Sequence, residues 1–167
     1  LIKGGIHLEE MGRLQSIAFD KTGTLTKGFP EVTDISTATT FTEFEMIQKV
    51  ASIESYSGHP LARAIVAYAS SQNLDHSPVE DFQSITGKGV KAQVDGMIVA
   101  IGSLKWAEET TTISGDVKEN VEMLQQQGKS VMVVLFNNQY AGHLAVADAI
   151  RETSPNIIKK LRELGIK

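Results

Sequence analysis

The feature of this sequence that most constrains its fold is a single junction, where the short apolar run 17–19 ends in Asp20. Residues 16–19 are expected to form a short buried strand. The segment that follows, residues 20–26, reads Asp-Lys-Thr-Gly-Thr-Leu-Thr. In open parallel sheets, reactive groups collect just beyond the carboxyl ends of the strands. The junction therefore predicts a reactive aspartate at the end of a buried strand.

The residues that follow Asp20 suit phosphoryl chemistry. An aspartate that attacks a phosphoryl group must be exposed, held in line and surrounded by groups that neutralise phosphate charge. Gly23 permits a tight turn, in which successive N–H groups cradle an anion. Lys21, Thr22 and Thr24 offer one positive charge and two hydroxyl donors. The simpler alternative is a strand followed by a glycine turn with a capping aspartate.

This seven-residue string resembles the signature of the P-type ATPases, cation pumps that belong to the haloacid-dehalogenase-like superfamily. The resemblance implies that Asp20 accepts phosphate and that its carboxylate and the backbone carbonyl of Thr22 help to hold Mg²⁺. Phosphatases of the superfamily carry a second aspartate two positions after the nucleophile, as general acid and base. Because this position is Thr22, an acyl phosphate is expected to persist, which favours a pump over a standalone phosphatase.

A second motif surrounds a His-Pro pair. Pro60 and the spacing of the apolar residues predict a helix from Pro60 to about Ser70. On the simpler interpretation, His59 or Ser57 only caps that helix. The heavy-metal branch of the P-type ATPases carries such a pair, with a glutamate five residues before the histidine, and Glu54 and His59 match this spacing. The resemblance implies that His59 orients the adenine and that Glu54 contacts the base region.

Two glycine sites follow. Residues 85–90 predict a turn that enters a strand, and Asp95-Gly96 predicts a two-residue hairpin turn before a strand at 97–101. The simpler interpretation of both glycine sites is an ordinary β-meander without a functional role. The resemblance implies a nucleotide pocket lined by Gly87, Gly89 and Val90, with Gly102 and Ser103 beside the phosphates. A helix cap is an equal explanation of Ser103. Lys88 is either a charge near the phosphates or a solvated turn residue.

Composition narrows the class of protein. A net charge of −4 with no basic stripe argues against nucleic acid as a partner. The absence of cysteine excludes disulfides and thiolate metal sites. The longest apolar run, 131–136, is far shorter than the roughly 18 residues that span a bilayer. Since the resemblance implies a membrane-embedded parent protein, we expect a cytoplasmic fragment in which residues 3–10 match the link from the last membrane helix.

The order of the predicted elements suggests one domain inserted into another. We expect the first part of a phosphorylation domain at 1–28, a nucleotide-binding domain at 29–143 and a truncated second part of the phosphorylation domain at 144–167. The family carries an Asp-x-x-Arg pair at the hinge between these domains, which Asp148 and Arg151 match. The alternative for this pair is a surface salt bridge.

The fold class is therefore expected to be α/β, with an antiparallel sheet and flanking helices inserted in a partial haloacid-dehalogenase-like, Rossmann-type domain. The remaining predicted elements are a strand at 32–37, helices at 42–53 and 117–127, a hairpin of 131–136 with 140–145, and a final helix that ends near 165 with Thr153 or Ser154 as its cap.

The resemblance covers the whole chain and implies the ATP-binding and phosphorylation region of a heavy-metal cation-transporting ATPase, possibly of the zinc/cadmium branch. Such a region binds MgATP and transfers the γ-phosphate to Asp20, which drives metal export across a membrane. Its partners are ATP and the parent protein's transmembrane and actuator domains, and the transported cation binds outside this chain. The alternatives are a non-catalytic nucleotide-binding fragment and a standalone phosphatase.

Overall fold

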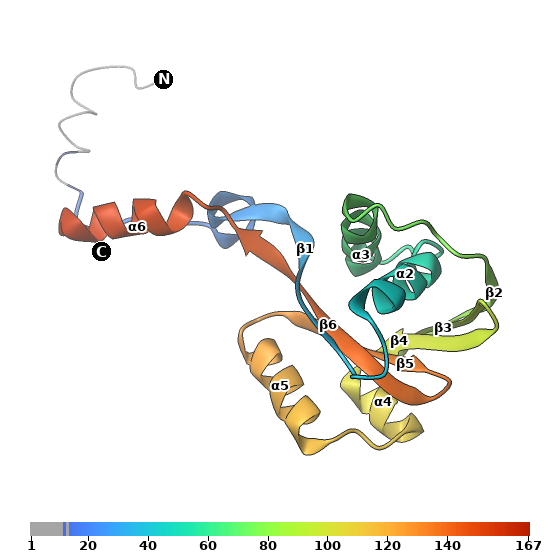
Figure 1. Cartoon of the computed structure of the whole chain (residues 1–167). Coiled ribbons are helices and arrows are strands. Elements are labelled where there is room, and N and C mark those ends of the chain that lie inside the picture. The colour runs from blue at the N-terminus through green and yellow to red at the C-terminus, as the bar shows by residue number, and fades with distance from the viewer. Residues whose placement is uncertain (1–11, 13) are drawn as a thin grey trace. The chain divides into compact units, whose positions relative to one another are not determined.

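The computed structural model describes residue 12 and residues 14–167, so the link expected at residues 3–10 lies outside the described residues. The chain divides into two compact units (Figure 1). The smaller unit combines the described residues up to Phe29 with Asp148–Lys167, and the larger unit is Pro30–Ala147. One unit is therefore inserted between two parts of the other along the chain.

A six-stranded sheet has the strand order β1-β6-β5-β4-β3-β2. Neighbours from β2 to β6 are antiparallel, as predicted. Helices cover the sheet of the larger unit, so the predicted α/β class is confirmed. The strands are β1 (Thr26–Thr37), β2 (Val79–Ile85), β3 (Gly89–Val94), β4 (Met97–Gly102), β5 (Ser130–Phe136) and β6 (Gln139–Ile150).

Both predicted hairpins are present. The β3–β4 turn is Asp95-Gly96, and both residues have positive φ, 50° and 75°. The β5–β6 turn is Asn137-Asn138, with φ values of 47° and 62°. Two-residue hairpins favour such turns because their twist matches that of the flanking strands. These short turns fix the register of the β3–β4 and β5–β6 pairs.

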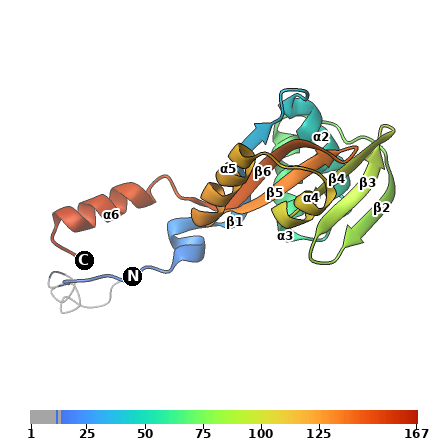
Figure 2. The same ribbon diagram turned by 90° about the horizontal axis from the view of Figure 1, so that it is seen from below.

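Helices pack on both faces of the sheet (Figures 1 and 2). One core, on the side of α2 and α3, contains Ile101, Phe136 and Leu144, and the second, with α4 and α5, contains their strand neighbours Ala100, Leu135 and Ala145. Successive side chains of a strand point to opposite faces, so each central strand serves both cores. The helices of the larger unit are α2 (Glu43–Glu54), α3 (Pro60–Ser71), α4 (Leu104–Thr110) and α5 (Gly115–Gln126).

The helix starts follow local signals. Thr42 caps α2 in a reciprocal capping box with Glu45, and Pro60 occupies the first turn of α3. The predicted bounds of both helices are correct to within one residue. Among the described residues, none of the helices combines the length and apolar character needed to cross a membrane.

The predicted buried strand at 16–19 is wrong. Residues 14–20 have no regular secondary structure, and Phe19 is 38% exposed. Backbone bonds join this segment to Lys167, whose N–H donates to Gln15 O and whose carbonyl accepts from Ile17 N–H, both at 2.9 Å. This is one rung of a parallel ladder. A strand needs a partner along its length, and in the described part of the smaller unit the segment has such backbone bonds only to Lys167.

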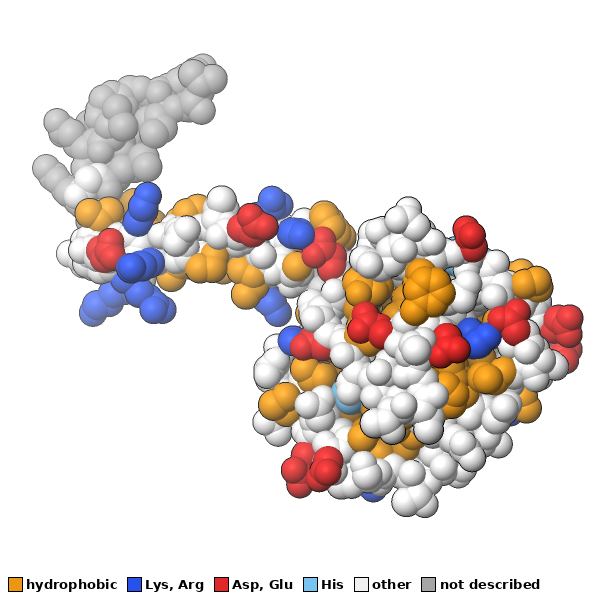
Figure 3. All heavy atoms as spheres, viewed as in Figure 1, with side chains coloured by type: hydrophobic (Ala, Val, Ile, Leu, Met, Phe, Trp, Pro, Cys, Tyr) orange, Lys and Arg blue, Asp and Glu red, His pale blue; other side chains and the backbone are white. Residues whose placement is uncertain are grey.

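The final helix, α6 (Ser154–Glu163), is present, and Thr153, one of the two predicted caps, occupies its N-cap position without a capping side-chain bond. Thr153 precedes the helix with helical backbone angles, φ −77° and ψ −24°, and its side chain makes no capping hydrogen bond. The Ser154 hydroxyl instead donates to the carbonyl of Leu25 at 2.9 Å. The hydroxyl of the first helix residue therefore bonds to the turn that contains Leu25 and does not cap its own helix. Basic and acidic side chains are mixed along α6 (Figure 3).

Candidate functional site

The segment after Asp20 forms a turn that depends on glycine. Thr22 has φ −76° and ψ 121°, and Gly23 has φ 77° and ψ −10°. These are the angles of the two central residues of a type II turn, whose second position requires a positive φ. Asp20, Lys21, Thr22 and Thr24 are all exposed. The turn thus presents all four predicted catalytic side chains to solvent.

Thr26 closes this turn from within. Its side chain is buried, 2% exposed, and its backbone N–H donates to Lys21 O. Its hydroxyl oxygen accepts the Gly23 N–H at 3.1 Å and lies 2.5 Å from Asp148 Oδ2. The hydroxyl also lies 3.0 Å from Lys21 O, but its one hydrogen is best donated to the closer, charged carboxylate. Thr26 therefore connects the turn, through Lys21 and Gly23, to Asp148.

Asp148 is held in its ionised form. The hydrogen bond from Thr26 lowers the pKa of its carboxyl below the ordinary value of 3.8, and the N–H of Gly28, at 2.8 Å from Oδ1, lowers this pKa further. An ionised carboxylate accepts from several donors at once, which suits this position.

Arg151 binds the same turn through its backbone carbonyls. Its Nε donates to Thr26 O at 2.9 Å, and its terminal NH2 donates to Gly23 O at 3.1 Å. Its own backbone N–H donates to Leu25 O at 2.9 Å. Within the part of the chain that the structure describes, Asp148 and Arg151 form no ion pair with each other. The alternative of a surface salt bridge between these two residues is therefore wrong, because both bind the turn instead.

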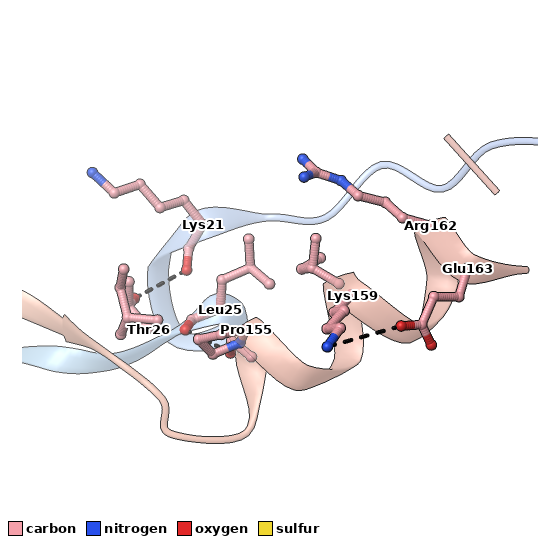
Figure 4. Close-up of a pocket in the computed structure, with 10 residues that line it drawn as sticks. Lys21, Leu25, Thr26, Pro155, Lys159, Arg162 and Glu163 are labelled. Carbon is pink, nitrogen blue, oxygen red and sulfur yellow. Dashed lines mark hydrogen bonds and ion pairs between the residues drawn. The ribbon is translucent and has the colours of Figure 1, made fainter. Parts of the chain in front are cut away.

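A cavity of about 750 Å³ lies between this turn and α6 (Figure 4). Most of the surface that lines it is apolar, although charged side chains stand among its residues, so it suits a polyphosphate poorly. In Figure 4 the ammonium group of Lys21 extends away from Leu25 and Pro155. The lining residues are Lys21, Leu25, Thr26, Ile150, Ser154, Pro155, Ile158, Lys159, Arg162 and Glu163.

A second cavity, of about 370 Å³, lies in the larger unit, and we call it the glycine pocket. Its volume lies in the range of small-molecule sites. It brings together residues from the end of α2, the start of α3, the β2–β3 turn and the end of β4. All seven residues predicted to bind nucleotide line it: Glu54, His59, Gly87, Gly89, Val90, Gly102 and Ser103.

Glu54 is a buried acid in this pocket, with 7% of its surface exposed. Burial raises the pKa of its carboxyl above the ordinary value, and a hydrogen bond with Ser57 offsets part of the increase. A buried acid with a perturbed pKa beside a cavity is a common mark of a functional site.

One ring nitrogen of His59 caps a helix, and the other faces solvent at the pocket. Its Nδ1 accepts the N–H of Leu61 at 3.2 Å, so it caps α3. Because Nδ1 accepts this bond, the hydrogen of the neutral imidazole lies on Nε2. The exposed ring therefore offers a hydrogen-bond donor at the pocket, so a cap and a ligand contact are compatible.

Two glycines let the backbones of β3 and β4 approach at the pocket. Gly89 and Gly102 are paired across the strands, and Gly89 has φ 152°. A Cβ on Gly89 would overlap Ile101 O and lie 2.6 Å from the Cα of Gly102. A Cβ on Gly102 would overlap Lys88 O and the ring of Trp106. The close approach explains both glycines without reference to a ligand, and it leaves the pocket wall without side chains at these two positions.

Ser103 caps α4, as the sequence allowed, since its Oγ accepts the Trp106 N–H at 3.3 Å. Its own N–H donates to Lys88 O at 2.9 Å. Lys88 lines the glycine pocket, and its side chain pairs with Glu109 on α4. Sequence reasoning missed Glu109, because 21 residues separate it from Lys88 and no local pattern relates them.

The described residues contain no group of three or more histidine or acidic side chains placed to hold a metal ion. In the turn after Asp20, the oxygen groups of the kind that hard cations bind are the Asp20 carboxylate and backbone carbonyls.

Residues 14–167 match the family model of haloacid dehalogenase-like hydrolases. A probable cadmium-transporting ATPase of Alkalihalophilus pseudofirmus is 47% identical over 172 aligned residues, which cover 100% of this chain and 24% of the relative. The chain thus spans about a quarter of the length of the curated relatives that it matches.

Two solved structures are similar to the whole chain. A zinc-transporting PIB-type ATPase in the E2.Pi state has a TM-score of 0.86 at 36% identity, over 27% of that chain. The catalytic domain of the CPx-ATPase CopB-B, described for its conformational changes upon nucleotide binding, has a TM-score of 0.61 at 26% identity, over 57% of that chain. The resemblance to heavy-metal P-type ATPases is confirmed, and the chain belongs to the haloacid dehalogenase-like hydrolase family.

Proposed function

We propose that this chain is the ATP-binding and phosphorylation region of a heavy-metal P-type ATPase. In this proposal the glycine pocket binds ATP and Asp20 accepts its γ-phosphate. The observation that carries the proposal is the convergence of seven residues, predicted from separate motifs, on one cavity of about 370 Å³. The parent protein then exports a divalent cation, and the named relatives favour zinc or cadmium.

The residues of the pocket have distinct tasks. The Nε2–H of His59 donates to the nucleotide beside the adenine, and the buried Glu54 carboxyl contacts the base. Gly87, Gly89 and Val90 let the base and ribose approach the backbone. Gly102 and Ser103 lie beside the phosphates.

The phosphoryl step uses the exposed turn. An oxygen of the Asp20 carboxylate attacks the γ-phosphorus of ATP, the bond from this phosphorus to the β,γ-bridging oxygen breaks, and ADP leaves with the electron pair. Lys21, Thr22 and Thr24 offset the phosphate charge. The contacts of Thr26 and Arg151 hold the backbone of the turn while its side chains stay exposed.

Mg²⁺ fits the oxygen ligands of this turn. The Asp20 carboxylate and the backbone carbonyl of Thr22 would hold the ion, with water and phosphate oxygens in the other positions. When bound, the cation neutralises charge on the transferred phosphoryl group. Thr22 supplies no carboxylate for water activation, which favours a lasting aspartyl phosphate over a phosphatase.

In the parent protein, this chain is proposed to lie on the cytoplasmic side of the membrane. Transmembrane and actuator domains would be its partners, and the transported cation would bind among the membrane helices.

Calorimetric titration of ATP, with and without Mg²⁺, tests the pocket. Wild type and the control His76→Ala, which changes an exposed histidine outside the pocket, should bind saturably. His59→Ala should bind up to about tenfold more weakly, the cost of about one hydrogen bond. Equal binding by His59→Ala contradicts the assignment of His59, and no binding by wild type contradicts the function.

Labelled phosphate tests the acceptor. Incubation with ATP labelled at the γ-phosphate should give a covalent label in wild type that is lost in Asp20→Asn. Binding without label would favour the non-catalytic alternative. Steady turnover of a simple phosphate ester would favour the phosphatase.

A further inference from the structure

We infer that Lys88 contacts the phosphate groups of the bound nucleotide, and that Glu109 competes with the nucleotide for this lysine. The inference rests on the proposed function, because it concerns the same pocket. In this inference, Lys88 is a charged residue that binds the phosphates, and Glu109 is a residue that holds Lys88 away from them.

Lys88 is the one lysine or arginine among the described residues that line the glycine pocket. The other ionisable lining residues are Glu54, which is buried, and His59. A nucleoside triphosphate carries several negative charges, and a lysine is a mobile point charge suited to contacting phosphate groups. The pocket thus offers a single side chain that can neutralise polyphosphate.

In the structure, the charge of Lys88 is paired with a carboxylate. The Nζ of Lys88 lies 2.5 Å from Oε2 of Glu109. Glu109 does not line the glycine pocket but lines another cavity, which includes Glu108 and Lys118. The ion pair therefore draws the ammonium group toward a carboxylate outside the pocket.

The pair is formed but weak enough to exchange. The hydrogen bond from Lys88 and the charge of this lysine lower the pKa of Glu109, so its carboxylate is ionised at neutral pH. The two side chains are 44% and 46% exposed. Exposed pairs are screened by water and contribute little to stability, so the phosphate groups compete with one carboxylate at small cost.

The backbone around the pair is fixed, so only the side chain has to move. The N–H of Lys88 donates to Ile85 O at 3.0 Å, and its carbonyl accepts from Ser103 N–H at 2.9 Å. Ser103 caps α4, the helix that carries Glu109. The lysine stem has several rotatable bonds. Exchange between Glu109 and phosphate thus needs rotamer changes alone.

The test compares ATP with adenosine, which lacks phosphate, in equilibrium titrations of the full 167-residue chain. Lys88→Met keeps the stem but removes the charge. It should lower ATP affinity about tenfold, the loss of a charge-assisted hydrogen bond, and leave adenosine affinity within about twofold. Glu109→Gln should raise ATP affinity about two- to fivefold, because the competing ion pair is gone.

A second ion pair on α4 provides the matched control. Lys118 Nζ lies 2.6 Å from Glu108 Oε1, with exposures of 41% and 39%. Glu108→Gln therefore makes the same change of charge on the same helix, at a residue outside the glycine pocket. It should leave ATP affinity unchanged. The double variant Lys88→Met/Glu109→Gln should bind ATP as Lys88→Met does, since Glu109 acts only through the lysine.

The outcomes separate this inference from the proposed function. If wild type binds ATP and Lys88→Met binds it equally well, the assignment of the pocket as the ATP site is retained and the inference is wrong. A gain in Glu108→Gln equal to that in Glu109→Gln would reduce the effect to general electrostatics and overturn the competition. If wild type binds neither ATP nor adenosine, the proposed function fails and this inference fails with it.

Discussion

The hydroxyl of Thr26 lies 2.5 Å from a carboxylate oxygen of Asp148, a residue 122 positions later in the chain. The same hydroxyl accepts the N–H of Gly23, the residue that gives the turn its positive φ. The shape of the loop that presents Asp20 therefore depends on a contact between the two sequence-distant parts of the smaller unit.

Thr26→Val keeps the shape of the side chain and removes the hydroxyl. It leaves the N–H of Gly23 and an oxygen of Asp148 without this partner, so we expect the smaller unit to lose about 1–3 kcal/mol of stability. Amide exchange at Gly23 and Gly28, followed by NMR, should accelerate accordingly. Thr26→Ser retains the hydroxyl and should preserve most of the protection. Equal exchange in the two variants would show that the hydroxyl does not hold the turn.

Local signals in the sequence predicted much of the larger unit. Pro60 marked the start of α3, and the turn residues at 95–96 and 137–138 marked the hairpins, since each signal acts within a few residues. The sequence also predicted the lining of the glycine pocket. That prediction came from resemblance to a family, because no local rule joins the end of α2 to the β2–β3 turn.

Contacts between distant residues were not predictable in this way. The run 17–19 has the composition of a strand, but a strand needs partners, and Lys167 supplies one rung. Thr153 or Ser154 was expected to cap the final helix, but the Thr153 side chain makes no capping bond and Ser154 donates to Leu25 instead. The pairing of Lys88 with Glu109 likewise depends on the tertiary placement of α4.

Glu54 should cost the protein stability at neutral pH. Burial raises the pKa of its carboxyl in the folded state above the ordinary value of 4.5, with Ser57 offsetting part of the shift. The unfolded chain then releases this proton more readily, so stability falls as pH rises from about 4.5 through the folded pKa. Glu54→Gln removes the ionisation. It should be more stable than wild type at about pH 7, by a margin that narrows toward about pH 4.5.

Urea unfolding across this pH range measures the margin. Glu122→Gln, a change at an exposed position of α5, controls for the loss of one negative charge and should show no such trend. A margin that stays constant with pH would contradict the burial argument. Retention of a destabilising acid beside a cavity is common at functional sites.

Gly89→Ala should be strongly destabilising. The added Cβ would overlap the backbone carbonyl of Ile101, and backbone in the middle of a sheet yields poorly. With φ at 152° the new residue is also strained. We expect a loss of about 2–4 kcal/mol in unfolding free energy, together with loss of ATP binding. Gly115→Ala, in the first turn of α5 with open space around it, should be neutral or slightly stabilising. Similar losses in both variants would contradict the close-approach argument.

His143 should make the larger unit sensitive to mild acid. Its ring is 2% exposed on β6, with Nδ1 2.7 Å from the Tyr140 hydroxyl and Nε2 2.8 Å from Asn120 Oδ1. The neutral ring satisfies both contacts, by donating to Asn120 and accepting from Tyr140, whereas a second ring hydrogen would face the Tyr140 hydroxyl. Burial lowers the pKa of His143 below its ordinary value of 6.5, although the charge of Asp34 offsets part of this. The unfolded chain therefore binds the proton first, and stability falls as pH decreases through about 6.5.

Compared with His143→Gln, which cannot titrate, wild type should lose unfolding free energy between about pH 7.5 and 5.5. His76→Gln, at an exposed histidine, should follow wild type. Parallel pH profiles for wild type and His143→Gln would show that the buried ring is not the group that titrates.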